Sequence, residues 1–283
     1  MLAPSAHPPR RWLRPGFAGR LARAGCLTVV VGYVVLAGLT VARRGGPLPF
    51  VVGTDLVAIL TGARILEQGQ PELLYDRGAE AAAQTEILRQ AGLGPIRLLP
   101  YLHPPFEALV LAPLHAAGLS YPGIFACWVL LGLTALAGSL VLLAGAWPLP
   151  PGTGRLGVLA VASFLPVFVA VLLGQNSGIL VLAWAGASVF LRRGADGRAG
   201  ALLALAAIKP QALPVLLLVL LITGRWRALA GFAVALGVPL VATLPLLGWD
   251  WPLRYLPVAL SAGGYPPDPT VDPSLMPNWR GQI

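Results

Sequence analysis

Two charged side chains stand where they could act on a substrate at a membrane surface. Asp55 follows the long apolar run 24–42 and has apolar neighbours on both sides. A carboxylate there could take a proton from a hydroxyl presented at the membrane face. The structural alternative is an acid in the first turn of a helix, where the helix dipole favours negative charge. The spacing alone leaves both interpretations open.

Lys209 is the only lysine among 20 basic residues, and it lies inside an apolar run that also holds Pro210 and Pro214. A lysine within a membrane span costs about 2.5–3.5 kcal/mol and indicates function by default. The two prolines make a continuous helix unfavourable, and freed backbone groups need a protein or water lining. An ammonium in such a cavity suits a phosphate. The structural alternative is an ion pair with Glu107, the only acid in a predicted span.

Four further polar side chains are candidates for substrate contacts. His103 could bind a ligand or support Asp55, or it could be an interfacial histidine with a satisfied hydrogen bond. Gln175 and Asn176, between two apolar runs, could contact a substrate or hold helices together. Arg64, nine residues after Asp55, falls on the opposite side of a helix and favours a headgroup or phosphate contact.

The motifs and composition exclude several classes of protein. The sequence has no phosphate-binding glycine loop, HExxH or CxxC, so neither an ATP site nor a nucleotide-sugar site is indicated, and the need for a divalent metal stays open. Only 11% of residues are charged and 57% are apolar, whereas soluble chains carry about 25% charged residues. The net charge of +9 comes from arginines that mostly flank apolar runs, which is typical of membrane topology and not of a nucleic-acid partner.

The order of apolar and polar segments predicts an all-α integral membrane protein with about seven spans. Because five arginines crowd the first segment, we expect a cytoplasmic N-terminus and a multi-pass protein of the plasma membrane. The expected segments are a basic N-terminus (1–23), a first span (24–42), an extracytoplasmic loop (43–103), a multi-span bundle (104–249) and a second extracytoplasmic loop (250–283).

Within the first loop we expect two surface helices, over 54–68 and 76–91, with Thr54 as the N-cap of the first. Beyond it, 104–119 and 121–147 each predict one span, 156–191 predicts two, and 199–224 and 228–249 predict one each. One signal disagrees with this count. The count places the arginines of 192–198 outside, against the positive-inside trend, whereas it places those of 225–227 inside, as that trend predicts.

Several short motifs occur in an order that resembles glycosyltransferase family 87, which includes mycobacterial phosphatidylinositol-mannoside mannosyltransferases. The resemblance covers residues 54–229. It rests on Thr54-Asp55, Gly62-Ala63-Arg64-Ile65-Leu66, Tyr101 with Pro104-Pro105-Phe106, Gly174-Gln175-Asn176, Ile208-Lys209-Pro210-Gln211 and Arg225-Trp226-Arg227.

The resemblance implies a GT-C-like helical bundle and an inverting glycosyltransferase. Such enzymes take a hexose, often mannose, from a polyprenyl-phosphate sugar and pass it to a lipid-linked or glycan hydroxyl on the outer face. The acid in the first outer loop is the expected general base, here Asp55. Lys209 and Arg64 are the expected contacts of the donor phosphate.

Family members usually continue with further spans, so we expect the chain to be a fragment or a truncated product. Two other functions remain open from the residues alone. One is a transporter or flippase for a lipid-linked anion, which a broken helix with an intramembrane cation also suits. The other is an inactive membrane scaffold.

Overall fold

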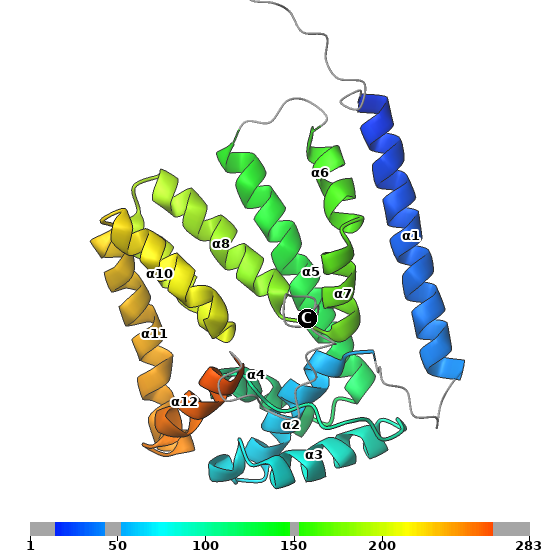
Figure 1. Cartoon of the computed structure of the whole chain (residues 1–283), viewed down its shortest axis with the longest axis vertical. Coiled ribbons are helices and arrows are strands. Elements are labelled where there is room, and N and C mark those ends of the chain that lie inside the picture. Colours follow the sequence, from blue (N-terminus) through cyan, green and yellow to red (C-terminus); the bar gives the residue numbers. More distant parts are fainter. Residues whose placement is uncertain (1–14, 43–51, 148–152, 263–283) are drawn as a thin grey trace, which may run out of the picture.

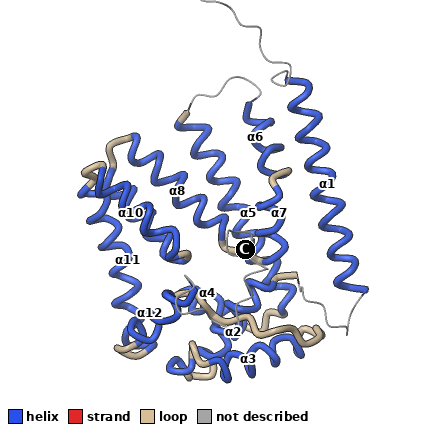
Figure 2. Tube along the Cα trace, in the orientation of Figure 1, coloured by secondary structure: helices blue, strands red, loops and turns tan. Residues whose placement is uncertain are grey.

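The described part of the chain is helical throughout. The computed structural model describes residues 15–42, 52–147 and 153–262, and no strand occurs among them (Figure 2). The all-α prediction is therefore confirmed for these residues.

A bundle of apolar helices makes up one part of the molecule (Figure 1). The predicted first span lies within α1, and the predicted pair of spans over 156–191 is divided among α6, α7 and α8. The bundle consists of α1 (Pro15–Ala42), α5 (Tyr121–Ala146), α6 (Thr153–Ala162), α7 (Leu165–Leu173), α8 (Ser177–Arg192) and α11 (Trp226–Leu247).

A second group of helices gathers at one end of this bundle, and we call it the cap (Figure 1). The cap consists of α2 (Thr54–Glu67), the 3-10 helix η2 (Pro71–Leu73), α3 (Arg77–Gln90), α4 (Pro105–Ala116) and α12 (Trp251–Ala262). Its core joins α2 and α4 to the start of α5 through Leu56, Tyr101, Leu111, Ile124 and Trp128.

Helix α2 differs from the expected surface helix. Nine of its residues, from Leu56 to Ile65, are buried, because α3 and α4 pack against it. The predicted N-cap is wrong by one residue. Gly53 occupies that position with a left-handed φ of 86°, and no side chain caps the helix. A Cβ at Gly53 would run into the Tyr121 hydroxyl, so glycine meets both a conformational and a steric requirement.

The segment 196–222 enters the bundle and turns back, and we call it the hairpin. It comprises α9 (Asp196–Leu203), the 3-10 turns η3 (Ala204–Ile208) and η4 (Pro210–Ala212), and α10 (Leu213–Ile222), with Lys209 at the turn. Leu220, near its end, packs in one cluster with Ala199 from its start and Ala228 from α11. Both ends of the hairpin therefore lie together, and the segment does not run across the bundle as one span.

The hairpin brings two arginine-bearing loops to the same end of the molecule. Arg225 forms a 2.8 Å ion pair with Asp196, and the Arg192 guanidinium lies 4.9 Å from the centre of the Trp147 ring. The predicted placement of 192–198 and 225–227 at opposite ends is therefore wrong. Because the chain turns back at Lys209–Pro210, one crossing is removed between the two loops.

Two helices are long and apolar enough to cross a membrane among the described residues. They are α5 and α11, and only 17% and 11% of their most apolar windows are buried. A core helix of a soluble protein would be mostly buried, so this exposure is consistent with a membrane protein. In contrast, α4 has 12 residues, fewer than the roughly 20 that a span needs.

The contact between α9 and α11 predicts a specific cost for one added methyl group. A Cβ at Gly231 would collide with the backbone carbonyl of Gly197, whereas a Cβ at Gly237 in the same helix meets nothing. We expect Gly231→Ala to destabilise the protein by about 1–3 kcal/mol and to lower the unfolding temperature in detergent. Gly237→Ala is the matched control and should be neutral or slightly stabilising, since alanine is the better helix former. Equal unfolding temperatures for the two variants would contradict this packing.

Candidate functional site

Asp55 lies in the first turn of α2, where the cap meets the bundle, and its side chain is half-buried. The Gln175 side chain donates a hydrogen bond to its carboxylate, and His103 and Lys209 lie close enough for their charges to act on it. Burial raises the pKa of Asp55 above its ordinary value, and these three residues offset part of that rise. Three of the predicted site residues thus gather around the predicted base.

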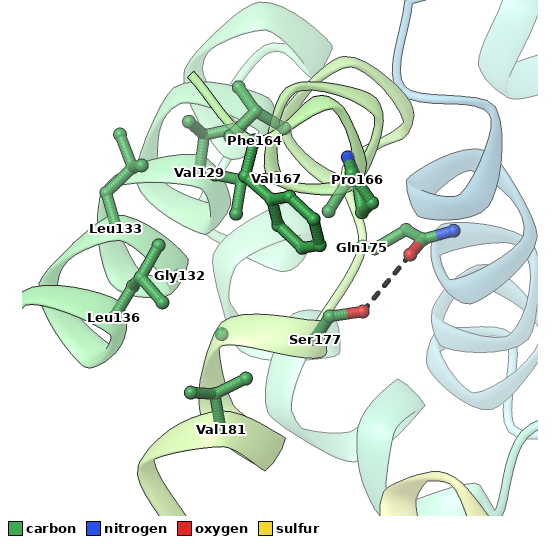
Figure 3. Close-up of a pocket in the computed structure, with 13 residues that line it drawn as sticks. Val129, Gly132, Leu133, Leu136, Phe164, Pro166, Val167, Gln175, Ser177 and Val181 are labelled. Atoms are coloured by element: carbon green, nitrogen blue, oxygen red, sulfur yellow. Dashed lines mark hydrogen bonds between the residues drawn. The ribbon is translucent and has the colours of Figure 1, made fainter. Parts of the chain in front are cut away.

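A chain of hydrogen bonds connects Asp55 to Lys209. The Lys209 ammonium donates to the Ser177 hydroxyl at 2.9 Å. That hydroxyl donates to the Gln175 amide oxygen at 3.1 Å, and this second bond is drawn in Figure 3. The Gln175 amide nitrogen in turn donates a hydrogen bond to the Asp55 carboxylate. Lys209 and Asp55 are therefore held in a fixed relation through Ser177 and Gln175.

Breaks between helices place the members of this chain. Lys209 sits between η3 and η4, where its non-helical backbone (φ −127°, ψ 77°) interrupts the helical path ahead of Pro210. Gln175 follows Gly174, which ends α7 in the left-handed conformation at φ 69°. The Trp128 indole donates to the Gly174 carbonyl at 2.9 Å and holds this turn against α5.

The start of α2 is tied to the same region by backbone contacts. The Gly53 amide donates to the Leu172 carbonyl at 2.8 Å, and the Tyr121 hydroxyl lies 3.1 Å from the Gly53 carbonyl. These bonds join α2 to α7 and α5 immediately before Asp55. The carboxylate is consequently positioned by the bundle as well as by its own helix.

Glu107 is a second buried acid at the site, with only 4% of its surface exposed. It lies in the first turn of α4, where the helix dipole favours its charge. The His103 Nδ1 lies 3.2 Å from one of its oxygens, and the Asn176 amide donates to the other at 2.8 Å. The Asn176 amide nitrogen therefore binds Glu107 of α4, which agrees with the second of the two alternatives for this residue, a polar contact that holds helices together.

Lys209 and Glu107 do not form the direct ion pair that was the structural alternative for Lys209. The hydrogen-bond acceptor of Lys209 is Ser177, and no ion pair within 4.0 Å joins it to Glu107 among the described residues. The Glu107 charge still acts on Lys209 over a longer distance. The site thus holds two acids, Asp55 and Glu107, and two basic groups, His103 and Lys209. Lys209 is not engaged in a direct ion pair with Glu107.

Aromatic rings of the cap fix His103. The Tyr75 hydroxyl donates to the His103 carbonyl at 3.2 Å, and the Tyr101 ring lies 5.7 Å from the imidazole. Tyr101 is fully buried, and Tyr255 of α12 packs against Tyr75 at 5.6 Å. With Nδ1 engaged by Glu107, the imidazole keeps Nε2 as the nitrogen for a further partner.

Arg64 is the predicted site residue that the structure does not bring to Asp55. Nine residues of helix separate the two by about 14 Å along the axis. Arg64 instead lies 3.4 Å from Glu67, whose carboxylate also contacts the His115 ring at 2.7 Å. This cluster forms a separate polar group at the far end of α2.

The sequence analysis missed Ser177 as a site residue and treated Glu107 only as a structural partner of Lys209. Ser177 was detectable, because it directly follows the Gly174-Gln175-Asn176 motif and opens α8. Glu107 was noted only as a partner for Lys209, since nothing in the spacing indicates that His103 and Asn176 converge on it. In the part of the chain that the structure describes, no group of three His, Cys, Asp or Glu residues could hold a metal ion.

The described part of the chain is all-helical and apolar, and a carboxylate, an imidazole and an ammonium lie together at one end of its bundle. The family model of glycosyltransferase family 87 matches residues 101–266, more than half of the chain. The chain belongs to glycosyltransferase family 87, which supports glycosyltransferase activity. No curated protein and no solved structure matches it significantly.

The hydrogen bond from Gln175 predicts a pH effect on sugar transfer. Because this bond lowers the pKa of Asp55, Gln175→Ala should raise that pKa further. If Asp55 must be ionised to act, activity falls as the pH drops through its pKa. The acid limb of the kcat/KM profile should therefore move to higher pH in this variant.

Gln68→Ala is the matched control for this experiment, since Gln68 is exposed at the end of α2 and remote from Asp55. Its pH profile should overlay that of the wild type. An unshifted acid limb in Gln175→Ala would show that the contact does not govern the ionisation that matters for transfer.

Proposed function

We propose that the protein transfers a hexose, mannose being the first candidate, from a polyprenyl-phosphate sugar to a hydroxyl of a lipid-linked or glycan acceptor, with inversion. The observation that carries this proposal is the hydrogen-bonded chain from Asp55 to Lys209 through Gln175 and Ser177. It sets a proton acceptor and a phosphate-binding cation at a fixed separation. Membership of family 87 supplies the glycosyl-transfer class.

The chemistry follows from these positions. The acceptor hydroxyl gives its proton to Asp55 while its oxygen attacks C1 of the donor sugar. The bond between C1 and the phosphate oxygen breaks, and polyprenyl phosphate leaves with the electron pair. Attack opposite to the leaving group inverts C1, and no covalent enzyme intermediate forms. Lys209 and His103 would offset the negative charge of the leaving phosphate.

The environment of Asp55 suits a general base. A catalytic base works best when its pKa approaches the working pH. Burial shifts the pKa of Asp55 in that direction, and the nearby positive charges keep the carboxylate available. The Asn176 Oδ1, which is buried and has no hydrogen-bond partner among the described residues, could accept a bond from a substrate hydroxyl.

The same arrangement supports an orientation in the plasma membrane. The loops with Arg192, Arg225 and neighbouring arginines lie at the end of the bundle away from the cap (Figure 1). Because arginines favour the cytoplasmic side, the cap and the site would face outward. In this orientation the N-terminus is cytoplasmic, and 43–103 and 250–283 are extracytoplasmic. The crossings would be made by α1, α5, α6 with α7, α8, and α11.

Replacement of the base tests the proposal directly. Asp55→Asn keeps the shape of the side chain but removes its ability to take a proton. We expect transfer of labelled mannose from polyprenyl-phosphate mannose, in membranes with a panel of lipid acceptors, to fall at least about 100-fold. Glu72→Gln, at an exposed acid of the cap, is the control and should retain activity. Full activity of Asp55→Asn in correctly folded protein would refute the base assignment.

The role of Lys209 is separable from that of Asp55. Lys209→Ala should raise the KM for the donor about tenfold or more, because a charge-assisted contact to phosphate is lost. Lys209→Arg should keep part of the affinity, since it keeps the charge. The acceptor KM should change little in both variants. An unaltered donor KM in Lys209→Ala would mean that Lys209 only supports the structure.

A further inference from the structure

Five arginines gather at the end of the bundle where the hairpin begins and ends. The 2.8 Å ion pair between Arg225 and Asp196 joins the start of α11 to the start of α9. A Cβ at Gly197 would lie 3.8 Å from the Arg227 carbonyl, so the two helix starts lie against each other there as well. We call this group the arginine patch, and it consists of Arg192, Arg193, Arg198, Arg225 and Arg227.

The charge of the arginine patch is not balanced by the protein. Five arginines and one acid, Asp196, leave four net positive charges in the segments 192–198 and 225–227. Arg193, Arg198 and Arg227 are exposed, and none of them forms an ion pair within 4.0 Å in the part of the chain that the structure describes. Because like charges on adjoining segments repel each other, an anion bound among them would stabilise the patch.

An exposed apolar face of α10 leads to the arginine patch. The face is about 15 Å long, since α10 has ten residues, and this is roughly the depth of one leaflet in a hydrocarbon core of about 30 Å. Helix α10 ends three residues before Arg225. The side chains of this face recur at helical spacing and are each more than half exposed, and they are Val215, Leu218, Val219 and Ile222.

Two tryptophans lie at the level of the arginine patch. Trp226 stands between Arg225 and Arg227 and is 64% exposed. Trp147 is partly exposed, and its ring centre lies 4.9 Å from the Arg192 guanidinium. Tryptophan is enriched where a membrane meets water. The arginine patch therefore belongs at the level of the lipid headgroups.

We propose that the arginine patch binds the phosphate of an anionic phospholipid whose hydrocarbon chains lie along the exposed face of α10. Arginine suits this partner because its guanidinium donates two parallel hydrogen bonds to a phosphate. A free phosphate would leave the apolar face of α10 uncovered, and a zwitterionic phospholipid brings a positive charge that the patch repels.

Such a lipid would clamp the hairpin, because the arginines that hold its phosphate come from both ends of that segment. The turn of the hairpin carries Lys209, so the lipid would also steady the segment that places the ammonium. The binding requires neither a sugar donor nor an acceptor, and it is therefore independent of the proposed function.

Thermal unfolding in detergent tests the proposal. Phosphatidylglycerol, which is anionic, should raise the unfolding temperature of the wild type by about 3–6 °C more than zwitterionic phosphatidylcholine, since a ligand of the folded state stabilises it. Glycerol phosphate carries the anion without the chains and should raise it by less than about 1 °C at the same concentration. Equal effects of the two phospholipids, or of phosphatidylglycerol and glycerol phosphate, would overturn the lipid assignment.

Replacement of two exposed arginines locates the binding. Arg198→Gln/Arg227→Gln removes one charge from each end of the hairpin without breaking an ion pair. The affinity for phosphatidylglycerol, measured by native mass spectrometry, should fall at least about tenfold, because each arginine near a headgroup adds affinity. Unchanged affinity in this variant would contradict the proposal.

Arg20→Gln/Arg23→Gln is the matched control, since it removes the same charge from exposed positions on α1. Helix α1 packs mainly against α6 and α7, away from the hairpin. This variant should bind phosphatidylglycerol as the wild type does. An equal loss in the control would show that the overall charge attracts the lipid, and it would overturn the arginine patch as the site.

Hydrogen exchange on the wild type removes the dependence on folding of the variants. Phosphatidylglycerol should slow the exchange of backbone amides in 193–200 and 224–229 relative to phosphatidylcholine, because a bound ligand suppresses local opening. The amides of α2 and α3 in the cap should exchange equally in both lipids. Slowing confined to segments outside the arginine patch would contradict the proposal.

Discussion

The organisation of the molecule depends on how one ammonium group is kept in an apolar bundle. Lys209 finds a hydroxyl acceptor in Ser177 and two carboxylates within electrostatic range, Asp55 and Glu107. An unpaired charge in such surroundings would be costly, so these groups must be brought together by the fold. The turn in the hairpin, the α7–α8 junction and the start of α2 all meet at this point. Each of them departs from regular helix there.

The cap and the bundle contribute different parts of the chemistry. The cap supplies Asp55 on α2, whose start donates a backbone hydrogen bond to the bundle. It also supplies Glu107 on α4 and His103 just before that helix, next to the buried Tyr101. The bundle supplies Gln175 and Ser177 at the α7–α8 junction, and the hairpin supplies Lys209 at its turn. A carboxylate from one part and a cation from the other, joined by an amide and a hydroxyl, would suit the proposed transfer from a lipid-borne donor to an outside acceptor.

Helical class and the positions of most helices followed from apolar periodicity and composition, and the break at Lys209–Pro210 followed from the prolines. The return of the chain after that break did not follow from the sequence, because a proline marks an interruption of a helix but carries no information on the direction of the chain beyond it. The arginines of 192–198 held that information, since their conflict with the positive-inside trend reflected the missing crossing. Asp55, His103, Gln175 and Lys209 were predictable as polar residues in apolar surroundings. The role of Glu107 was not, because it depends on contacts across 69 residues.

The short helices of the hairpin, α9 and α10, also bear on how the protein is inserted and assembled during synthesis. Helix α9 has eight residues and α10 has ten, so neither leg can enter a bilayer core as an independent span. Small-residue contacts hold α9 against α11, and α11 is synthesised after the hairpin. Helix α9 also packs against α8, which is synthesised before the hairpin, so the packing on both sides of the hairpin is complete only when α11 has been made.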